Sequence, residues 1–247
     1  MAQIKMKASI LIVATDGYDA LRNSLYSLSL QRTSFPYEVC VLDVNSTIEL
    51  EPLVRKYIPN AKYRKINDSK VVFMYSQGIC LDLADPLSDV IVIQGNDIIY
   101  TQSNNLENLC NGVKPKLVSM AEVLNMDIDA DLYKNFNSEI GKILNNWEIY
   151  ARRTPPTGDI KPKEKKYSGP GSNAILFFLG AITRKDLEEA QFRKNNCDAV
   201  LYPNLARLGV GMCHPGVKGV HQKHFKIIYP CPIVDECKYN CSRKKGE

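Results

Sequence analysis

Three long, mostly apolar segments separated by helix-like segments constrain the fold of this chain more than any other feature of its sequence. The strand-like segments cover residues 9–14, 38–43 and 89–93. Their apolar character is typical of parallel strands that are buried on both faces. Strands that alternate with helices of about 10–13 residues form right-handed βαβ units. The sequence therefore predicts an α/β protein with a mostly parallel central sheet flanked by helices.

Shorter patterns place the remaining elements along the chain. Leu21, Leu25 and Leu28 predict a helix over residues 18–30. Ser46 or Thr47 is expected to cap a second helix that ends near residue 57. The other expected elements are a strand at 62–66, a helix at 71–83, a longer helix at 129–150, a mobile loop at 152–171, a strand at 174–183, a helix at 184–193 and a strand at 209–213.

Composition and charge exclude several classes of protein. Hydrophobic residues make up 45% and charged residues 24%, which excludes a disordered chain and a coiled coil. No run approaches the roughly 18–20 apolar residues of a membrane helix, and the N-terminus is expected to be a strand, not a signal peptide. The eight Cys are therefore expected to be reduced thiols of a cytoplasmic protein. Residues 151–247 carry 18 Lys and Arg against 9 Asp and Glu, whereas residues 1–150 carry 14 against 18. The two halves are therefore expected to face different partners, or the second half to hold an anion.

Acidic residues follow the three strand-like segments, at the edge where parallel sheets bind ligands. Asp16 lies in the turn after the first, Asp43 ends the second and Asp97 follows the third. A carboxylate at Asp43 can accept a hydrogen bond from the imide N–H of a uracil ring. One at Asp97 can hold a hard divalent cation together with diphosphate oxygens and water. A single Asp after a strand is usually a turn carboxylate, but three on neighbouring strands are more specific.

These segments resemble the family 2 glycosyltransferases of the GT-A fold over about residues 8–110. The family's first strand, its turn and a helix ending in Ser-Leu-x-x-Gln-Thr correspond to residues 9–17 and 25–33. Its Glu-Val-x-Val-x-Asp-Asp-x-Ser-Thr block corresponds to residues 38–47, and its Gly-containing helix with the metal-binding Asp pair to residues 76–97. A looser similarity continues through residues 178–184.

The resemblance implies a single GT-A domain over residues 1–226 and a Cys-containing basic tail over residues 227–247. Within the domain, residues 1–112 would be the nucleotide-sugar half and residues 113–226 the acceptor half. It also implies an inverting glycosyltransferase that moves a sugar from a nucleotide donor, UDP first, to a hydroxyl acceptor, with Mn²⁺ or Mg²⁺ as cofactor. A glycan or lipid-linked glycan ranks first as acceptor, then a protein, and modified nucleic acid last.

The same matching assigns most of the donor site. The implied donor-binding residues of the first half are Thr15, Asp16, Asp43, Asn45, Gly78 and Asn96. The chain departs from the family in the first turn, where Ala14 replaces a Pro and Asp16 an aromatic residue. It also departs in the acidic pairs: Val44 replaces the second Asp of the strand-two pair, and Asn96 replaces the first Asp of the metal pair. Asp97 is then the carboxylate left for the cation.

A late His and two Lys are expected to complete the donor site. His221 is one of three His within eleven residues, and it falls after the last expected strand, where several GT-A enzymes have a His that holds Mn²⁺. A His is also a common structural residue, so both readings stay open. Lys218 and Lys223 beside it could neutralise the leaving diphosphate.

An inverting transferase needs a general base that takes the proton of the acceptor hydroxyl. The residue that resembles the family's base is Asp198, and the competing carboxylates are Asp186, Glu188 and Glu189. The basic stretch 152–166 is expected to be a lid over the donor or a solvated linker. The tail Cys are expected to be free thiols, a disulfide or, less often, a zinc site; they are Cys231, Cys237 and Cys241.

Two other functions stay open at this point. Val44 and Asn96 also fit a nucleotide-sugar binding protein that has lost catalysis. A nucleotidyltransferase needs a carboxylate-held metal too, but it normally has a Gly-rich loop with a cation directly after the first strand. Here no cation comes before Arg22, which argues against that activity. Hydrolysis of a panel of nucleotide sugars would separate an enzyme from a binding protein.

Overall fold

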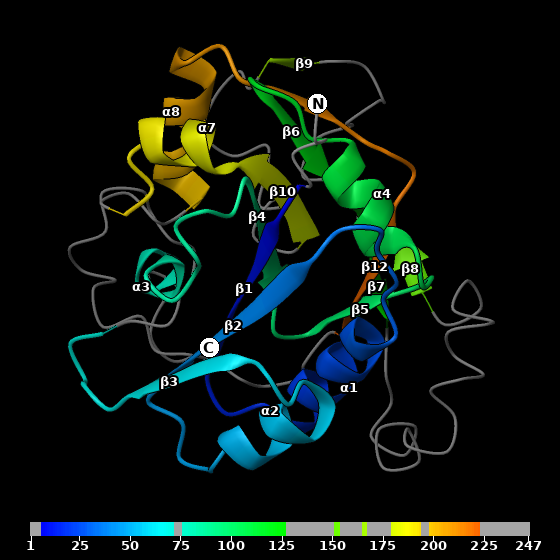
Figure 1. Cartoon of the computed structure of the whole chain (residues 1–247). Coiled ribbons are helices and arrows are strands. Elements are labelled where there is room, and N and C mark those ends of the chain that lie inside the picture. The colour runs from blue at the N-terminus through cyan, green and yellow to red at the C-terminus, as the bar shows by residue number, and fades with distance from the viewer. Residues whose placement is uncertain are drawn as a thin grey trace.

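The computed structural model describes residues 6–71, 76–126, 151–153, 165–166, 179–193 and 198–222. Among these, the three apolar segments form β1 (Ala8–Ala14), β2 (Tyr37–Val44) and β4 (Val90–Gly95). They lie at the centre of an eight-stranded sheet with the order β3-β2-β1-β4-β10-β6-β11-β9 (Figure 1). The other strands of this sheet are β3 (Lys62–Ile66), β6 (Leu117–Met120), β9 (Lys165–Lys166), β10 (Gly180–Thr183) and β11 (Gly211–Cys213).

Most strands of this sheet run in one direction. β1 pairs in parallel with β2 and β4, and β2 pairs in parallel with β3. β10 is antiparallel to both β4 and β6, whereas β11 is parallel to β6, so β6 and β11 share the direction of β4. The predicted α/β class with a mostly parallel sheet is therefore confirmed.

Alternate residues of the central strands enter two helical layers. Ile10 and Ile12 pack on the side that holds α1 (Tyr18–Ser29), α2 (Glu51–Tyr57) and α4 (Asn105–Asn111). Leu11 and Val13 pack on the side that holds α3 (Gln77–Leu81), α7 (Arg184–Glu189) and α8 (Asp198–Arg207). Figure 1 shows the two layers on opposite sides of the sheet. Burial on both faces explains why these strands are continuously apolar. No helix among the described residues is long and apolar enough to span a bilayer.

A second, four-stranded sheet with the order β5-β12-β7-β8 lies beside the end of β4. Its strands are β5 (Ile98–Tyr100), β7 (Glu122–Met126), β8 (Ala151–Arg153) and β12 (Lys218–Gln222). The chain turns from β4 into β5, and β12 pairs antiparallel with β5. This pairing carries the late part of the chain to the carboxyl end of β4.

Several expected elements differ in the structure. The helix expected from residue 46 begins only at Glu51, after Leu50, because Ser46 and Thr47 contact the loop after β1 instead of capping it. The helix expected at 71–83 is shortened to α3, with 72–75 outside the described residues. The other differences are in the second half of the chain.

The loop expected at 152–171 includes the end of β8 and all of β9. His221 lies inside β12 and not beyond the last strand. Both differences come from short strands that pair with distant partners, which local composition does not reveal. The helix expected at 129–150 and the tail from residue 223 lie outside the described residues.

The cysteines that the structure describes form no disulfide with one another. Cys40, Cys80 and Cys110 are buried, and Cys213 is half-buried. Burial raises the pKa of Cys40 and of Cys110 to about 12, so neither forms a thiolate at neutral pH. Cys231, Cys237 and Cys241 lie outside the described residues.

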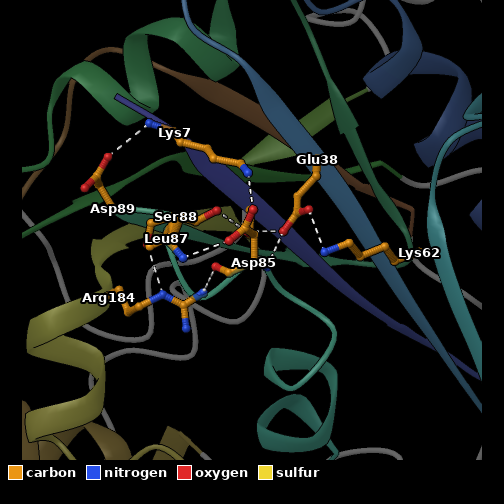
Figure 2. Close-up of polar contacts among 9 residues, drawn as sticks. Lys7, Glu38, Lys62, Asp85, Leu87, Ser88, Asp89 and Arg184 are labelled. Atoms are coloured by element: carbon orange, nitrogen blue, oxygen red, sulfur yellow. Dashed lines mark hydrogen bonds and ion pairs between the residues drawn. The ribbon is translucent and has the colours of Figure 1, made fainter. Parts of the chain in front are cut away.

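A network of ion pairs closes the amino edge of the parallel strands (Figure 2). The Glu38 carboxylate accepts from the Ser9 hydroxyl at 2.7 Å and from the Asp85 N–H, and pairs with the Lys62 ammonium at 2.9 Å. Lys7 pairs with Asp85, and Arg184 donates to the carbonyl oxygens of Asp85 and Ser88 at 2.6 and 3.0 Å. These contacts fasten the loop before β4 to the sheet.

Replacing Glu38 by Gln is expected to lower the free energy of unfolding at pH 7 by about 1–3 kcal/mol. Burial alone would raise the pKa of Glu38, but hydrogen bonds from Asp85, Lys62 and Ser9 outweigh it and lower the pKa. The stabilisation is therefore complete above the ordinary value of 4.5 and is lost as pH falls through the lower pKa of the folded state. Urea unfolding of both proteins at pH 7 and about pH 3 measures this.

The matched control is Glu49→Gln, because the ion pair of Glu49 with Lys65 leaves the Glu49 side chain 74% exposed. We expect little change in stability from that variant. A Glu38→Gln difference that stays the same at both pH values would show that the carboxylate charge does not stabilise this edge.

Candidate functional site

The carboxyl edge of the parallel strands gathers the acidic residues singled out in the sequence. In the sheet register Ala14 of β1 lies beside Asp43 of β2, and Val13 lies beside Gly95 of β4. The turns that follow β1 and β4 therefore leave the sheet next to Asp43. Asp16 lies in the first turn and Asp97 in the second.

Asp97 contacts a residue from the far end of the described chain. The Asp97 Oδ2 and His221 Nε2 atoms lie 2.9 Å apart, although 124 residues separate the two in sequence. The turn from β4 to β5 carries Asp97, and β12 places His221 in register with Ile98 of β5. The side chains are 17% and 20% exposed, so the pair is accessible to a small ligand.

Buried amides hold the two elements that carry this pair. Gln222 is fully buried, and both its backbone N–H and its side-chain amide donate to the carbonyl oxygen of Asp97, at 3.0 and 3.2 Å. The same amide donates to the Ala20 carbonyl at 3.1 Å and accepts from the Asn23 amide at 2.8 Å. Helix α1 is thereby joined to β12 and to the β4–β5 turn. Gln222 holds the turn through the backbone of Asp97, so the carboxylate is not used in this support and contacts His221.

Asp43 is the most deeply buried acidic residue at this edge. Its side chain is 0% exposed, and Oδ2 accepts from the Tyr63 hydroxyl at 2.6 Å. Oδ1 is buried and has no hydrogen-bond partner among the described residues. A buried, unpaired carboxylate oxygen is costly, so a ligand with an N–H or O–H donor would relieve that cost here.

Two other residues predicted to bind the donor brace the loops of this edge. Asp16 accepts from the backbone N–H and the hydroxyl of Thr47, at 2.7 and 2.9 Å, and its own N–H donates to Ser46 Oγ at 2.9 Å. The Asn45 amide donates to the carbonyl oxygens of Asp68 and Val71 at 2.9 and 3.0 Å. Both residues have positive φ, 42° and 55°, which Asp and Asn tolerate better than other side chains.

The remaining residues predicted to bind the donor occupy different positions. Thr15 is buried at the end of β1, Gly78 is buried in α3, and Asn96 is half-buried in the β4–β5 turn beside Asp97. Lys218 begins β12 three residues before His221, so their side chains leave the strand on opposite faces. The strand register therefore does not support the prediction that Lys218 and His221 act together on the diphosphate. Lys223 lies outside the described residues.

The carboxylates of α7 are not part of this edge. β10 is antiparallel to β4 and places Thr183 beside Val90, so α7 starts at the opposite, amino edge of the sheet. Asp186 is buried there, and its Oδ2 accepts from the Lys116 N–H at 2.8 Å and from the Thr183 hydroxyl at 2.7 Å. Glu188 pairs with Arg184 and Glu189 with Lys116. These three carboxylates therefore lie at the opposite edge from Asp43 and Asp97, and their position does not fit the role of the base.

Asp198 is the first residue of α8. This helix leads through residues 208–210 into β11, which has the direction of β4. A helix that precedes such a strand runs back across the sheet, so α8 begins on the side of the carboxyl edge. The side chain of Asp198 lies outside the described part of the structure.

The residues that sequence analysis missed at this site are Tyr63, Asn23 and Gln222. One signal was available for Asn23: polar residues share the inner side of the 18–30 helix with leucines, and Asn23, Ser24 and Ser27 are all buried. His214, another of the three late His, has its Nδ1 atom 3.2 Å from the Met120 carbonyl oxygen.

Comparison with models of known protein families gives no match, and comparison of the sequence with curated proteins gives none. Solved structures do match in fold. S. aureus TarS 1–349 has a TM-score of 0.56 and 12% identity over 88% of this chain, and it has been solved with UDP and with UDP-GlcNAc. GalNAc-T7 with UDP, GalNAc and Mn²⁺ has a TM-score of 0.59 and 14% identity over 93% of this chain. Mannosyltransferase PcManGT from Pyrobaculum calidifontis, with GDP-Man and Mn²⁺, has a TM-score of 0.52 and 15% identity over 89% of this chain.

At these identities the similarity shows the fold alone: the chain has the GT-A fold of these glycosyltransferases. The match spans 60%, 46% and 57% of the three neighbouring chains, respectively.

Proposed function

We propose that this chain is a glycosyltransferase that uses a divalent cation and a UDP-sugar and transfers the sugar to a hydroxyl acceptor with inversion. The observation that carries the proposal is the contact between Asp97 and His221 at the carboxyl edge of the sheet. In a GT-A fold this edge is the ligand-binding edge. The neighbouring structures that contain UDP, GDP-mannose and Mn²⁺ support the same class of donor and cofactor.

Asp97 and His221 are the residues that would hold Mn²⁺ or Mg²⁺. A carboxylate oxygen and an imidazole nitrogen are suitable ligands, above all for Mn²⁺. No group of three His, Cys, Asp or Glu side chains among the described residues could hold a metal ion. Diphosphate oxygens and water would therefore supply the other ligands. When bound, the cation would offset the charge of the departing diphosphate.

The chain's own residues would perform the other tasks. Asp43 Oδ1 would accept from the imide N–H of uracil, because it is a buried carboxylate oxygen that lacks a partner among the described residues. Asp198 would take the proton of the acceptor hydroxyl. A glycan or lipid-linked glycan is the proposed acceptor class, ahead of a protein or a modified nucleic acid.

UDP is expected to bind this protein more tightly than ADP or GDP, and Asp43→Ala is expected to reduce that preference by about 1–3 kcal/mol. The variant removes the acceptor of the imide proton and leaves the Tyr63 hydroxyl without its partner. Calorimetric titrations of the three diphosphates in the presence of Mn²⁺ measure the preference. A native protein that prefers a purine diphosphate would contradict the uridine assignment.

A nucleotide-sugar binding protein without catalysis is the second candidate, favoured by Asn96 in place of a carboxylate next to Asp97. Such a protein would bind the donor with the cation and release no UDP from it. A nucleotidyltransferase is a weaker candidate, because Arg22, the first cation after β1, is ion-paired with Asp19 at 3.0 Å.

A further inference from the structure

We infer that Tyr63 selects the base of the nucleotide, because its hydroxyl engages one oxygen of Asp43 and leaves the other as the acceptor without a partner among the described residues. The inference rests on the proposed function, and it adds a specificity-determining residue to that site. The fold itself does not choose the base, since similar structures contain either a uridine or a guanosine nucleotide.

The position of Tyr63 follows from the sheet register. β3 pairs in parallel with β2 and places Tyr63 beside Val41 and Lys65 beside Asp43. Side chains two residues apart on a strand share a face, so Tyr63 is a diagonal neighbour of Asp43. Its ring packs partly against the core on the α1 and α2 side, and its hydroxyl lies 2.6 Å from Asp43 Oδ2.

The hydroxyl of Tyr63 is a permanent donor at neutral pH. Burial and the hydrogen bond to Asp43 both raise its pKa above the ordinary value of 10. The proton therefore stays on the phenol and points to Oδ2. The phenol takes one of the two lone pairs of Oδ2, so a base that uses this oxygen has to share it with the phenol, whereas Oδ1 is buried with no partner among the described residues.

One free carboxylate oxygen matches uracil better than guanine. Uracil presents one imide N–H between two carbonyl groups. Guanine presents a ring N–H and an exocyclic amino group side by side, and a carboxylate binds the two through both of its oxygens. Because Oδ2 already accepts from the phenol, the amino group of guanine would have to share that oxygen, which weakens its hydrogen bond and disfavours GDP.

Two nucleotides that differ only in this amino group test the inference on the unmodified chain. Inosine diphosphate keeps the ring N–H of GDP and lacks the exocyclic amino group. In calorimetric titrations with Mn²⁺ we expect native protein to bind UDP more tightly than GDP, and inosine diphosphate at least as tightly as GDP. Tighter binding of GDP than of inosine diphosphate would mean that a second acceptor is available, and would overturn the inference.

Tyr63→Phe removes the hydroxyl and keeps the ring. We expect the ratio of UDP to GDP affinity to fall by about tenfold, chiefly because GDP binds more tightly once Oδ2 is free. GDP should then bind more tightly than inosine diphosphate. Tyr57→Phe, on α2, is the control for loss of a phenol and should leave both ratios unchanged. Circular dichroism melting checks that both variants fold, and the inosine comparison needs no variant.

The outcomes separate this inference from the proposed function. If native protein prefers UDP and Tyr63→Phe keeps the native ratio, Tyr63 does not select the base, and the proposed function stands. If native protein binds GDP as tightly as UDP with Tyr63 in place, the inference is again wrong, while a nucleotide-sugar transferase stands. If native protein binds none of the diphosphates with Mn²⁺, both are wrong.

Discussion

Asp97→Ala is expected to abolish the Mn²⁺-dependent part of UDP binding and to leave the fold intact. The cation would lose its only charged ligand among the proposed protein ligands, so the negative diphosphate would no longer be compensated. The fold should persist, because the backbone carbonyl of Asp97, and not its carboxylate, bonds Gln222. Calorimetric titration of UDP with Mn²⁺ and with a chelator measures the effect, and thermal melting checks the fold.

Asp89→Ala is the matched control, because Asp89 is an exposed carboxylate just before β4, at the amino edge. It should leave UDP binding unchanged. His221→Ala should weaken Mn²⁺-dependent UDP binding far more than His214→Ala, whose imidazole contacts the Met120 carbonyl. If UDP binding by Asp97→Ala stays as tight and as dependent on Mn²⁺ as in native protein, Asp97 is not a metal ligand.

Asp198→Asn is expected to slow sugar transfer by about 10²–10⁴-fold with nearly unchanged donor affinity. The amide keeps the shape of the carboxylate but does not take the proton of the acceptor hydroxyl. The base contacts the acceptor and not the nucleotide, so kcat should fall while the Kd for UDP stays the same. Transfer to an acceptor, measured together with titration of UDP, separates the two quantities.

Asp186→Asn is the control for this variant, because Asp186 is a buried carboxylate that bonds Lys116 and Thr183 at the opposite edge. It should lower the free energy of unfolding and leave the turnover of folded protein unchanged. If Asp198→Asn instead abolishes UDP binding, Asp198 has a structural or metal-binding role. The base would then not be sought in α7, whose carboxylates lie at the amino edge.

The central strands could be predicted because their signal is local. β1, β2 and β4 are buried on both faces by two helical layers, and this burial demands the continuous apolar segments that the sequence shows. Strand β3 was predicted at its observed bounds, Lys62–Ile66. The strands of the second sheet were missed, because they are short and pair with partners far away in the chain. Helix α2 begins later than predicted for a related reason. Ser46 and Thr47 bond Asp16, which is distant in the sequence, and do not cap the helix.

The charged residues of the site could be predicted from the sequence, but the residues that hold them in place could not. Asp43 and Asp97 were found because carboxylates at the ends of parallel strands converge on one edge. Tyr63 was missed because its role depends on lying diagonally across from Asp43, which requires the register of β2 and β3. Gln222 and Asn23 were missed because their hydrogen bond joins residues 199 positions apart. The proposed roles of His221 and Asp198 rested on the family resemblance and are still predictions.

Release of UDP from a UDP-sugar tests the central claim most directly. Native protein is incubated with a panel of UDP-, GDP- and ADP-sugars, with Mn²⁺ or with a chelator, and free nucleotide diphosphate is measured. We expect Mn²⁺-dependent release from at least one UDP-sugar and its loss in Asp97→Ala. Donor binding without release from any sugar nucleotide, with and without candidate glycan acceptors, would contradict the claim and identify a binding protein.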